Sequence, residues 1–297
     1  MRFGATGLGS DVTGDVTTRI AFRVGRSLSA GVVRFAVPPV SYTGPSQSRV
    51  SVSAVAIIPA RFQSTRLPGK ALADIAGRPM IEHVYRRACE AASVARVIVA
   101  TDDERIRSAV ERFGGECVMT SPSHQSGTDR LAEVASSLDA DIIVNVQGDE
   151  PLLEPAMIDA AVAPFTVDRG LMMSTLRKRI TDPAELDNPN VTKVVVDRHG
   201  FALYFSRAPI PFTRAGHPEA PAWRHIGMYV YRRECLLQLS RLPQTALERA
   251  EALEQLRALE HGIRIQAIET THDTIGVDTP DDLERVRRIC DGAVRPA

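Results

Sequence analysis

The sequence predicts an α/β fold in which helices cover both faces of a mostly parallel β-sheet, so that the molecule has three layers. Three short, largely apolar runs recur in the first half of the chain, at residues 55–59, 96–100 and 141–146. Runs of this length and character are typical of strands that are buried on both faces. Segments with a helical pattern separate the runs, and strands that alternate with helices form a parallel sheet.

The helices between these strands carry recognisable start and stop signals. Pro79 suits a first helical turn, and apolar residues follow it at helical spacing as far as Ala88. A second helix is expected over residues 103–113, where a Gly-Gly pair ends it. A third helix is expected over residues 128–138, with Thr128 as its cap.

The second half of the sequence is less regular. Residues 191–196 and 201–205 are strand-like and are separated by a short polar turn, which predicts a β-hairpin insertion. Residues 226–231 predict another strand, and residues 248–260 predict one helix with leucines on its apolar side. A final helix is expected to begin at Pro280.

Composition argues against several classes of function. Lys plus Arg equals Asp plus Glu, at 36 each, so the chain lacks the basic excess of a typical nucleic-acid-binding protein. The four cysteines are far apart and none has the spacing of a metal or redox pair, which is typical of reduced thiols in the cytoplasm. No apolar run approaches the roughly 18 residues that a membrane-spanning helix needs. We therefore expect a cytoplasmic protein with no nucleic-acid and no membrane partner.

The first 52 residues differ from the rest of the chain. They are rich in Gly, Ser, Thr and Val, contain six Arg, two Asp and no Lys, and show no helical or strand period. The arginines interrupt every apolar stretch, which argues against a secretory signal, while the acid-poor composition resembles that of an organellar transit peptide. We expect residues 1–52 to be a disordered extension or the product of a mis-assigned start, and residues 53–297 to form a single domain.

A cationic loop follows the first predicted strand. Residues 59–70 contain Arg61, Arg66 and Lys70, together with a Ser-Thr pair and a Gly directly before the lysine. Ligands of parallel sheets bind beyond the carboxyl ends of the strands, and a polyphosphate needs cations and free backbone N–H groups. The loop is not a Walker A motif, because Ala71 follows the lysine where that motif has Ser or Thr. It predicts a phosphate site rather than a solvated basic turn.

This loop resembles the signature loop of sugar nucleotidyltransferases, and more narrowly that of the 3-deoxy-manno-octulosonate (Kdo) cytidylyltransferase family. Further matches to the family follow in the same order along the chain. They lie at residues 100–102, 124–133, 144–151, 202–207, 225–229, 253–257 and 276–283. The resemblance covers roughly residues 55–290. One tetrapeptide is a weak signal, whereas seven collinear blocks are very specific.

The resemblance implies a Rossmann-like sheet of the nucleotide-diphospho-sugar transferase type. It implies a nucleotidyltransferase that transfers CMP from CTP to Kdo, releases pyrophosphate and forms CMP-Kdo for lipopolysaccharide synthesis. Mg²⁺ is the implied cofactor, CTP and Kdo are the implied substrates, and a homodimer is the implied assembly. Two alternatives stay open. One is a cytidylyltransferase for a related acidic sugar, such as 8-amino-Kdo or, less favoured, a sialic acid; the other is a non-catalytic nucleotide-binding protein.

The resemblance also assigns roles to individual residues. Asp149 and Asp278 are the implied metal ligands, whereas Glu150 is interpreted as structural. The implied catalytic residues are Arg61, Arg66, Lys70, Asp149 and Asp278. The implied nucleotide-binding residues are Ala60, Arg61, Ser64, Arg66, Lys70, Gln125, Ser126, Gly127 and Arg130. The implied sugar-binding residues are Gln147, Arg207, His225, Tyr229, Glu254 and Gln255.

Several of these residues also have a structural interpretation. Asp278 stands where a turn acid commonly precedes a helix cap. A lone histidine such as His225 is more often a hydrogen-bonded core residue than a ligand, and Arg207 also suits an ion pair with a carboxylate. Glu254 and Gln255 also suit the exposed face of a helix.

A protein that begins at Ser53 is expected to fold and to keep the full activity of the chain. Residues 1–52 have no periodic apolar positions with which to offset the cost of ordering, about 1–2 kcal/mol per residue for the backbone. Limited proteolysis of the full-length protein should trim it to about the same point. An insoluble or inactive truncated protein would contradict this prediction, and would show that the arginine-rich segment packs on the domain or serves its assembly.

Overall fold

The computed structural model describes four ranges of the chain and the backbone of two strands near the N-terminus. The ranges are residues 54–63, 67–124, 126–217 and 220–292. The chain divides into two compact units, residues 1–48 and 49–297. In the first unit, β1 (Ile20–Val24) pairs with β2 (Ser27–Gly31) as an antiparallel hairpin, which the sequence analysis did not predict. The disorder predicted for the rest of residues 1–52 lies outside the described residues.

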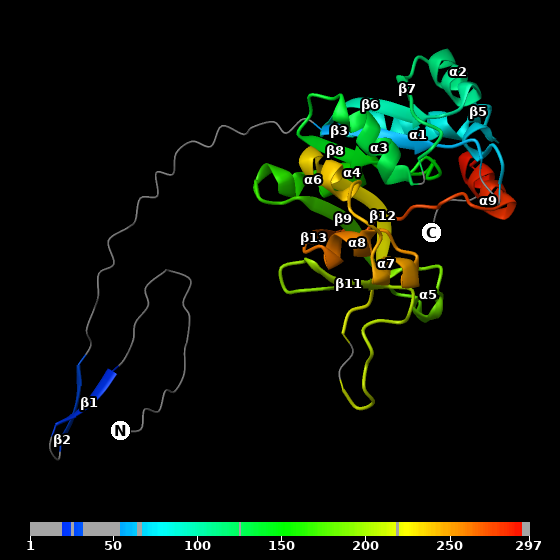
Figure 1. Cartoon of the computed structure of the whole chain (residues 1–297). Helices are drawn as coiled ribbons and strands as arrows, with labels where there is room; N and C mark the ends of the chain where they lie inside the picture. Colours follow the sequence, from blue (N-terminus) through cyan, green and yellow to red (C-terminus); the bar gives the residue numbers. More distant parts are fainter. Residues whose placement is uncertain are drawn as a thin grey trace. The chain divides into compact units, whose positions relative to one another are not determined.

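A nine-stranded sheet is the centre of the second unit (Figure 1). Its strands are β3 (Ala54–Ala60), β6 (Val94–Thr101), β7 (Cys117–Met119), β8 (Ile142–Asn145), β9 (Met173–Arg179), β10 (Lys193–Val196), β11 (Ala202–Ser206), β12 (Trp223–Arg232) and β13 (Ile265–Glu269). β8, β3, β6 and β7 lie side by side and run parallel. β12 runs antiparallel to β8 and β9, and β9 pairs in parallel with β13. The predicted mostly parallel sheet is confirmed.

Helices cover the two faces of this sheet and give it three layers. The described helices of this unit are α1 (Met80–Cys89), α2 (Glu104–Arg112), α3 (Gly127–Ser136), α4 (Pro155–Val162), α5 (Pro183–Asp187), α6 (Arg233–Leu239), α7 (Ala246–Glu251), α8 (Gln255–Glu260) and α9 (Pro280–Cys290). Side chains of α1 and α4 belong to one apolar core, and those of α3, α6 and α8 to a second. Alternate residues of β3 divide between the two cores, Ala56 and Ile58 in the first and Val55 and Ile57 in the second. This strand is therefore buried on both faces, as its continuous apolar run predicts.

Most of the predicted elements are confirmed. The three predicted strands of the first half are β3, β6 and β8, and the predicted helices are α1, α2, α3 and α9. The predicted hairpin is formed by β10 and β11, which pair antiparallel. The sequence analysis missed β9, β13, α4 and α6. β9 has the sequence MSTLRKR and is buried only over its first four residues, so it presents neither a continuous apolar run nor a clean alternation.

The single helix predicted over residues 248–260 is wrong. The structure has α7 and α8 there, separated by Ala252, which has a positive φ of 51°. This left-handed residue ends α7, and Leu253 N donates a hydrogen bond to Glu248 O at 3.2 Å. The leucine spacing continues through the break because Leu253 and Leu256 both reach the core. A helical pattern therefore did not reveal a break of one residue.

A small apolar cluster packs the last helix of the domain against residues near its beginning. The short strands β4 (Asp74–Ile75) and β5 (Arg78–Pro79) form a ribbon after the cationic loop. Leu283 and Val286 of α9 pack with Ile75 of this ribbon. Because α9 is anchored there, the segment that precedes it lies beside the carboxyl ends of β3 and β8.

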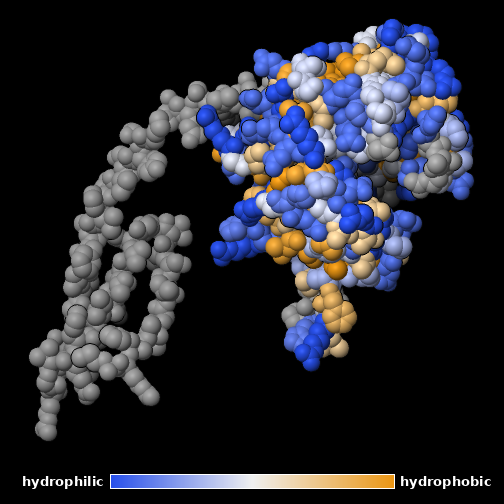
Figure 2. All heavy atoms as spheres, in the orientation of Figure 1, coloured by the Kyte–Doolittle hydropathy of each residue, from blue (hydrophilic) through white to orange (hydrophobic). Residues whose placement is uncertain are grey.

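Apolar side chains are exposed at and after β11. Leu203 is 63% exposed, and Phe212, on the irregular segment that follows β11, is 88% exposed. Figure 2 shows apolar atoms on this projecting segment. Among the described residues, no helix combines the length and the apolar character that crossing a membrane requires.

Candidate active site

The two predicted metal ligands meet at one lysine. Lys70 Nζ lies 2.6 Å from Asp149 Oδ2 and 3.1 Å from Asp278 Oδ1. Lys70 is 79 positions from Asp149 and 208 from Asp278 along the chain, so only tertiary folding joins them. A turn acid alone does not explain the place of Asp278 in this cluster of charges.

Three loops position these side chains. Asp149 follows β8, and its carbonyl accepts a hydrogen bond from Val277 N at 2.9 Å, which joins the two acidic segments. Asp278 N donates to Asp282 Oδ2 at 3.2 Å, beside the capping box that begins α9. Lys70 opens a short 3₁₀ turn at the end of the cationic loop. The cluster therefore lies beyond the carboxyl ends of the parallel strands, as expected for a ligand site in such a sheet.

Gly148 lets the loop after β8 lie against β3. A Cβ atom at this position would lie 2.8 Å from Pro59 O, a backbone atom of β3. No side chain is compatible with that distance unless one of the two backbone segments moves. The sequence analysis did not identify Gly148 as a site residue, although a glycine directly before an acid at a strand end is a signal for close backbone approach.

Lys70 stays charged between the two carboxylates. Burial is the largest single influence on the pKa of Lys70 and lowers it, but the charges and hydrogen bonds of Asp149 and Asp278 together outweigh burial and raise the pKa above its ordinary value. A protonated amine here offsets the repulsion between two like charges. It also places a cation where phosphate oxygens would approach the acids.

Asp149 and Asp278 have the chemistry of a hard-cation site. Mg²⁺ is commonly bound by one or two carboxylates together with substrate phosphates and water. Among the residues that the structure describes, no group of three or more His, Cys, Asp or Glu side chains is placed to hold a metal ion. The pair therefore fits a divalent cation that shares its coordination with a phosphate ligand.

The cationic loop after β3 is closed at its base by backbone contacts. Gly69 N donates to Phe62 O at 2.8 Å. Gly69 has a φ of 72°, a conformation that residues with side chains rarely adopt, and the Phe62 ring lies 3.1 Å from where a Cβ would stand. The turn that positions Lys70 therefore requires a glycine at position 69.

The other residues predicted for this loop fall into three groups. Ala60 is the buried last residue of β3. Arg61 Nη2 donates to His124 O at 3.0 Å, which connects the loop to the segment before α3. Ser64 and Arg66 lie outside the described residues, so their predicted contacts stay predictions.

α3 begins with a capping box in the segment predicted to bind cytosine. Asp129 N donates to Ser126 Oγ at 3.0 Å, and Ser126 N donates to Asp129 Oδ2 at 3.1 Å. The prediction that Thr128 caps this helix is therefore wrong, since Ser126 is the cap. Gly127 is the first helical residue, and Gln125 lies outside the described residues.

Arg130 of α3 is fully buried. Its Nη2 donates to Asp102 Oδ2 at 2.8 Å, and its Nη1 donates to Thr120 Oγ1. Asp102 directly follows β6, so this ion pair ties α3 to the carboxyl end of the sheet. The sequence analysis did not assign a role to Asp102, although it belongs to one of the matched blocks. Arg130 Nε has no hydrogen-bond partner among the described residues.

His225 and Tyr229 project from β12 on either side of an irregularity in its pairing with β9. His225 Nε2 and Thr175 Oγ1 are 2.9 Å apart, and the imidazole meets the Phe205 ring edge-on at 4.9 Å between centroids. Burial lowers the pKa of His225 to about 3, so this imidazole is neutral at physiological pH. Burial, with a smaller effect of the Glu254 charge, raises the pKa of the Tyr229 phenol well above its ordinary value. Both rings are therefore neutral hydrogen-bonding groups.

Gln147 and Arg207 are both held by backbone carbonyls. Gln147 Nε2 donates to Gly227 O at 3.0 Å. Arg207 Nε donates to Glu251 O at 2.7 Å, and its two Nη groups donate to carbonyls of neighbouring turns at 3.1 and 3.4 Å. The guanidinium of Arg207 thus donates to carbonyl oxygens beside α7, unlike the carboxylate pair of the structural interpretation.

Glu254 and Gln255 lie at the start of α8, where Gln255 is buried and Glu254 is partly buried. Glu254 Oε2 accepts a hydrogen bond from Thr128 Oγ1 at 2.9 Å, and Gln255 is only 6% exposed. The alternative that the two residues form an exposed helix face is wrong for Gln255, whereas the Glu254 side chain is partly buried and 36% exposed. The hydrogen bond to Thr128 therefore joins the start of α8 to the start of α3.

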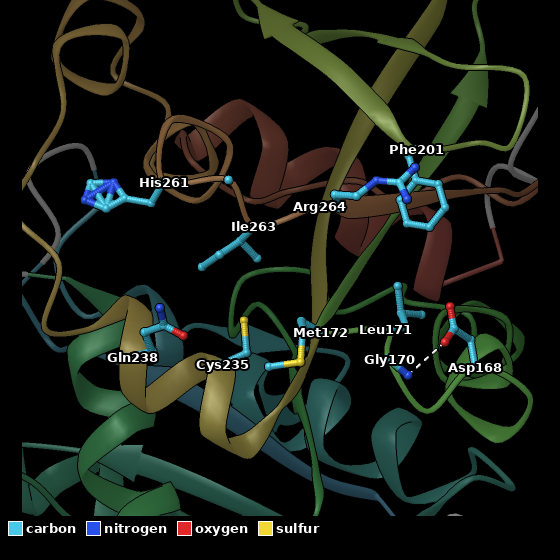
Figure 3. Close-up of a pocket in the computed structure, with 11 residues that line it drawn as sticks. Asp168, Gly170, Leu171, Met172, Phe201, Cys235, Gln238, His261, Ile263 and Arg264 are labelled. Carbon is cyan, nitrogen blue, oxygen red and sulfur yellow. Dashed lines mark hydrogen bonds between the residues drawn. The ribbon is translucent and has the colours of Figure 1, made fainter.

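A cavity of about 420 Å³ lies away from these residues (Figure 3). Leu171, Met172, Cys235, Ile263 and Arg264 are among the residues that line it, so it lies at the amino ends of β9 and β13. β9 runs in the same direction as β8, because both pair antiparallel with β12. The cavity is therefore at the opposite end of the strands from Asp149, and none of the predicted site residues lines it.

Lys70, at the end of the loop after β3, contacts two carboxylates beyond the strand ends, an arrangement that suits the phosphates and divalent cation of a nucleotidyltransferase. A family model described as "Cytidylyltransferase" matches residues 55–265. The 3-deoxy-manno-octulosonate cytidylyltransferase of Geobacter sulfurreducens is 57% identical over 241 residues, which are 78% of this chain and 96% of the relative. The protein of the same name from Solibacter usitatus is 56% identical over 233 residues, which are 78% of this chain and 92% of the relative. The chain belongs to the 3-deoxy-manno-octulosonate cytidylyltransferase family.

Solved structures agree with this assignment. One described as CMP:2-keto-3-deoxy-manno-octonic acid synthetase complexed with CTP is 47% identical, with a TM-score of 0.78, and the match covers 82% of this chain and 100% of that one. A cytidylyltransferase from Leptospira borgpetersenii has the same fold, with a TM-score of 0.54 at 17% identity over 81% of this chain and 87% of that one. The predicted nucleotide-diphospho-sugar transferase type of sheet is thus confirmed.

Proposed function

We propose that the protein transfers CMP from CTP to Kdo, releases pyrophosphate and forms CMP-Kdo for lipopolysaccharide synthesis. The observation that carries this proposal is the contact of Lys70 with both Asp149 and Asp278 at the end of the cationic loop. It combines a phosphate-binding cation with a pair of acids suited to a divalent ion. The identity of more than half to relatives that bear the name of this activity supports the choice of substrates.

The reaction is an in-line attack of the anomeric hydroxyl of the sugar on the α-phosphorus of CTP. Such transfers depend on positioning and on stabilisation of charge. Arg61, Arg66 and Lys70 neutralise the triphosphate and the leaving pyrophosphate. A divalent cation held by Asp149 and Asp278, which we propose to be Mg²⁺, supplies polarisation of the α-phosphate and a lower pKa of the attacking hydroxyl.

The acceptor is an anion with many hydroxyl groups, and the residues around β12 match that chemistry. Arg207 provides a cation for the carboxylate. His225 and Tyr229 are neutral, so they serve as hydrogen-bonding groups for hydroxyls rather than as charges. Gln147 adds an amide group whose Nε2 donates to Gly227 O, and an amide oxygen can accept a hydrogen bond from a hydroxyl.

A pyrophosphate-release assay tests this function against its alternatives. CTP, UTP and ATP are each combined with Kdo, 8-amino-Kdo and N-acetylneuraminate, with Mg²⁺ present. Release with CTP and Kdo supports the proposal, and faster release with 8-amino-Kdo would assign the enzyme to that sugar. Activity with N-acetylneuraminate but not with Kdo would refute the assignment of the acceptor, and no release with any sugar would favour a non-catalytic nucleotide-binding protein.

CTP is expected to be strongly preferred to UTP. The segment of Ser126 and Gly127 is proposed to bind the exocyclic amine of cytosine, which uracil lacks. A site built around one pattern of donors and acceptors rejects an analogue that leaves its polar groups unpaired. The ratio of kcat/KM for the two nucleotides measures this preference, and equal use of UTP would show that the segment has another role.

We further propose a homodimer located in the cytoplasm. Leu203, in β11, and Phe212, on the segment after β11, are large apolar side chains that are both exposed. Exposed apolar groups of this kind are typical of a surface that another chain covers. Light scattering of the purified protein measures the assembly, and a monomer at micromolar concentration would exclude a stable dimer.

A further inference from the structure

Thr128 connects two segments that the proposed function assigns to different substrates. It is the second residue of α3, in the segment proposed to bind cytosine, and it is 4% exposed. Its Oγ1 donates to Glu254 Oε2 at 2.9 Å, although Glu254 is 126 positions further along the chain. Glu254 is one of the residues proposed to bind the acceptor sugar.

α3 does not use the Thr128 hydroxyl for its own start. Its capping box is closed by Ser126 and Asp129. A threonine inside a helix commonly donates to a carbonyl one turn earlier, but at the second helical position no preceding helical turn exists. The hydroxyl is therefore available for a tertiary contact, and the contact that it makes is with Glu254.

The carboxylate of Glu254 is likewise not used by its own helix. Glu254 is the N-cap residue of α8 but makes no side-chain capping hydrogen bond. Its Oε1 has no hydrogen-bond partner among the described residues. Arg257 Nη2 lies 3.6 Å from Oε1 and is already bound to Glu248 Oε1. Within the described part of the chain, Thr128 thus makes the hydrogen bond that orients this carboxylate.

Glu254 keeps the capacity to bind a further donor. A carboxylate oxygen accepts two hydrogen bonds, so Oε2 has room for one donor besides Thr128. The Glu254 side chain is 36% exposed, so a ligand can reach it. A hydroxyl group of a sugar is a donor of the right kind for this position.

We propose that Thr128 is a positioning residue for the acceptor sugar. Its hydroxyl holds the Glu254 carboxylate in the orientation in which Oε2 accepts a hydrogen bond from a sugar hydroxyl. The inference rests on the proposed function, since it takes Glu254 as an acceptor-binding residue. The same hydrogen bond fixes the place of the acceptor site relative to the start of α3, and so relative to the nucleotide.

Thr128→Val tests the inference, because valine keeps the branched shape and loses only the hydroxyl. We expect the KM for Kdo to rise by about tenfold, the loss expected for one hydrogen bond to a charged group. The KM for CTP, and the affinity for CTP measured by calorimetry without acceptor, should stay unchanged. Thr128→Ser restores a donor and is expected to return the KM for Kdo close to that of the native protein.

A double-mutant cycle separates positioning from a merely structural role. In a Glu254→Ala protein, Thr128→Val should cause no further rise in the KM for Kdo, because the residue acts through Glu254. Ser174→Ala is the matched control. It removes another buried hydroxyl, which donates to Ala161 O at 2.7 Å on the face of β9 opposite to that of Thr175, and should lower the melting temperature without changing either KM.

Three results would overturn the inference: an unchanged KM for Kdo in Thr128→Val, an equal rise in both KM values, or a Thr128→Ser protein as impaired as Thr128→Val. If the valine protein does not fold, Thr128→Ala is compared with Thr128→Ser by the same measurements. Failure of the native protein to release pyrophosphate from CTP and Kdo would instead refute the proposed function.

Discussion

Replacing Asp149 by Asn is expected to lower turnover by roughly 10²–10³-fold, which corresponds to the ~3–4 kcal/mol typical of a lost electrostatic contribution in an active site. The change keeps the size of the side chain and removes one of the two charges that are proposed to hold the divalent cation. Asp278→Asn is expected to have an effect of the same size, because Lys70 contacts both carboxylates in one cluster. Pyrophosphate release at saturating CTP, Kdo and Mg²⁺ measures turnover.

The double variant should be little worse than either single variant, because the two carboxylates act as one unit. Glu150→Gln is a close control, since it changes the adjacent acid to its amide. Burial, and then the charge of Asp149, raise the pKa of Glu150 to about 7, and this residue is not among the proposed ligands. The control should retain near-normal turnover. Near-normal turnover of Asp149→Asn at saturating Mg²⁺ would remove Asp149 from the mechanism.

Gly148→Ala is expected to lower turnover by about 10²-fold, since a displacement of about 1 Å at a reacting centre has effects of that size. The added Cβ would stand 2.8 Å from Pro59 O, so the loop after β8 must move away from β3. Asp149 is the next residue and moves with it. Turnover is measured as above, and the melting temperature shows how much the fold itself is affected.

Gly276→Ala provides the matched control for this substitution. Gly276 lies two residues before Asp278, and its φ lies outside the left-handed region. Apart from its chain neighbours, no described residue has an atom within 4 Å of where its Cβ would be. Its replacement should therefore leave turnover unchanged. Normal turnover of Gly148→Ala would show that the loop shifts without moving Asp149. An equal loss of turnover in both variants would show that an added side chain in either acidic segment causes the defect, and not the contact with Pro59.

The elements of the first half could be predicted because their signals are local. The apolar runs that become β3, β6 and β8 are buried on both faces, so they have few polar positions to obscure them. The start of α9 was equally clear, because Pro280 marks the first turn of that helix. β9 was missed for the opposite reason, since its second half is polar and its place beside β12 depends on pairing.

The site was predicted as a set of residues but not as a set of contacts. The cations of the loop after β3 were evident from their spacing, and the family resemblance named the two acids. It did not show that Thr128 bonds to Glu254, that Arg130 is held by Asp102, or that Ser126 rather than Thr128 caps α3. Each of these depends on which neighbour lies within about 3 Å, which is a property of packing.

The sequence by itself determined the family, the alternating strands and helices, and the chemical types of the residues that are proposed to meet the substrates, because these follow from local periodicity and from the order of short motifs. Only the tertiary structure decided how those residues meet. Lys70 and Asp278 are 208 positions apart, and they touch because α9 packs on the ribbon of β4 and β5 and returns its own N-terminus to the carboxyl ends of the parallel strands. This contact depends on the burial of Leu283 and Val286 against Ile75. These residues are far apart along the chain, so no local sequence pattern predicts that they pack together.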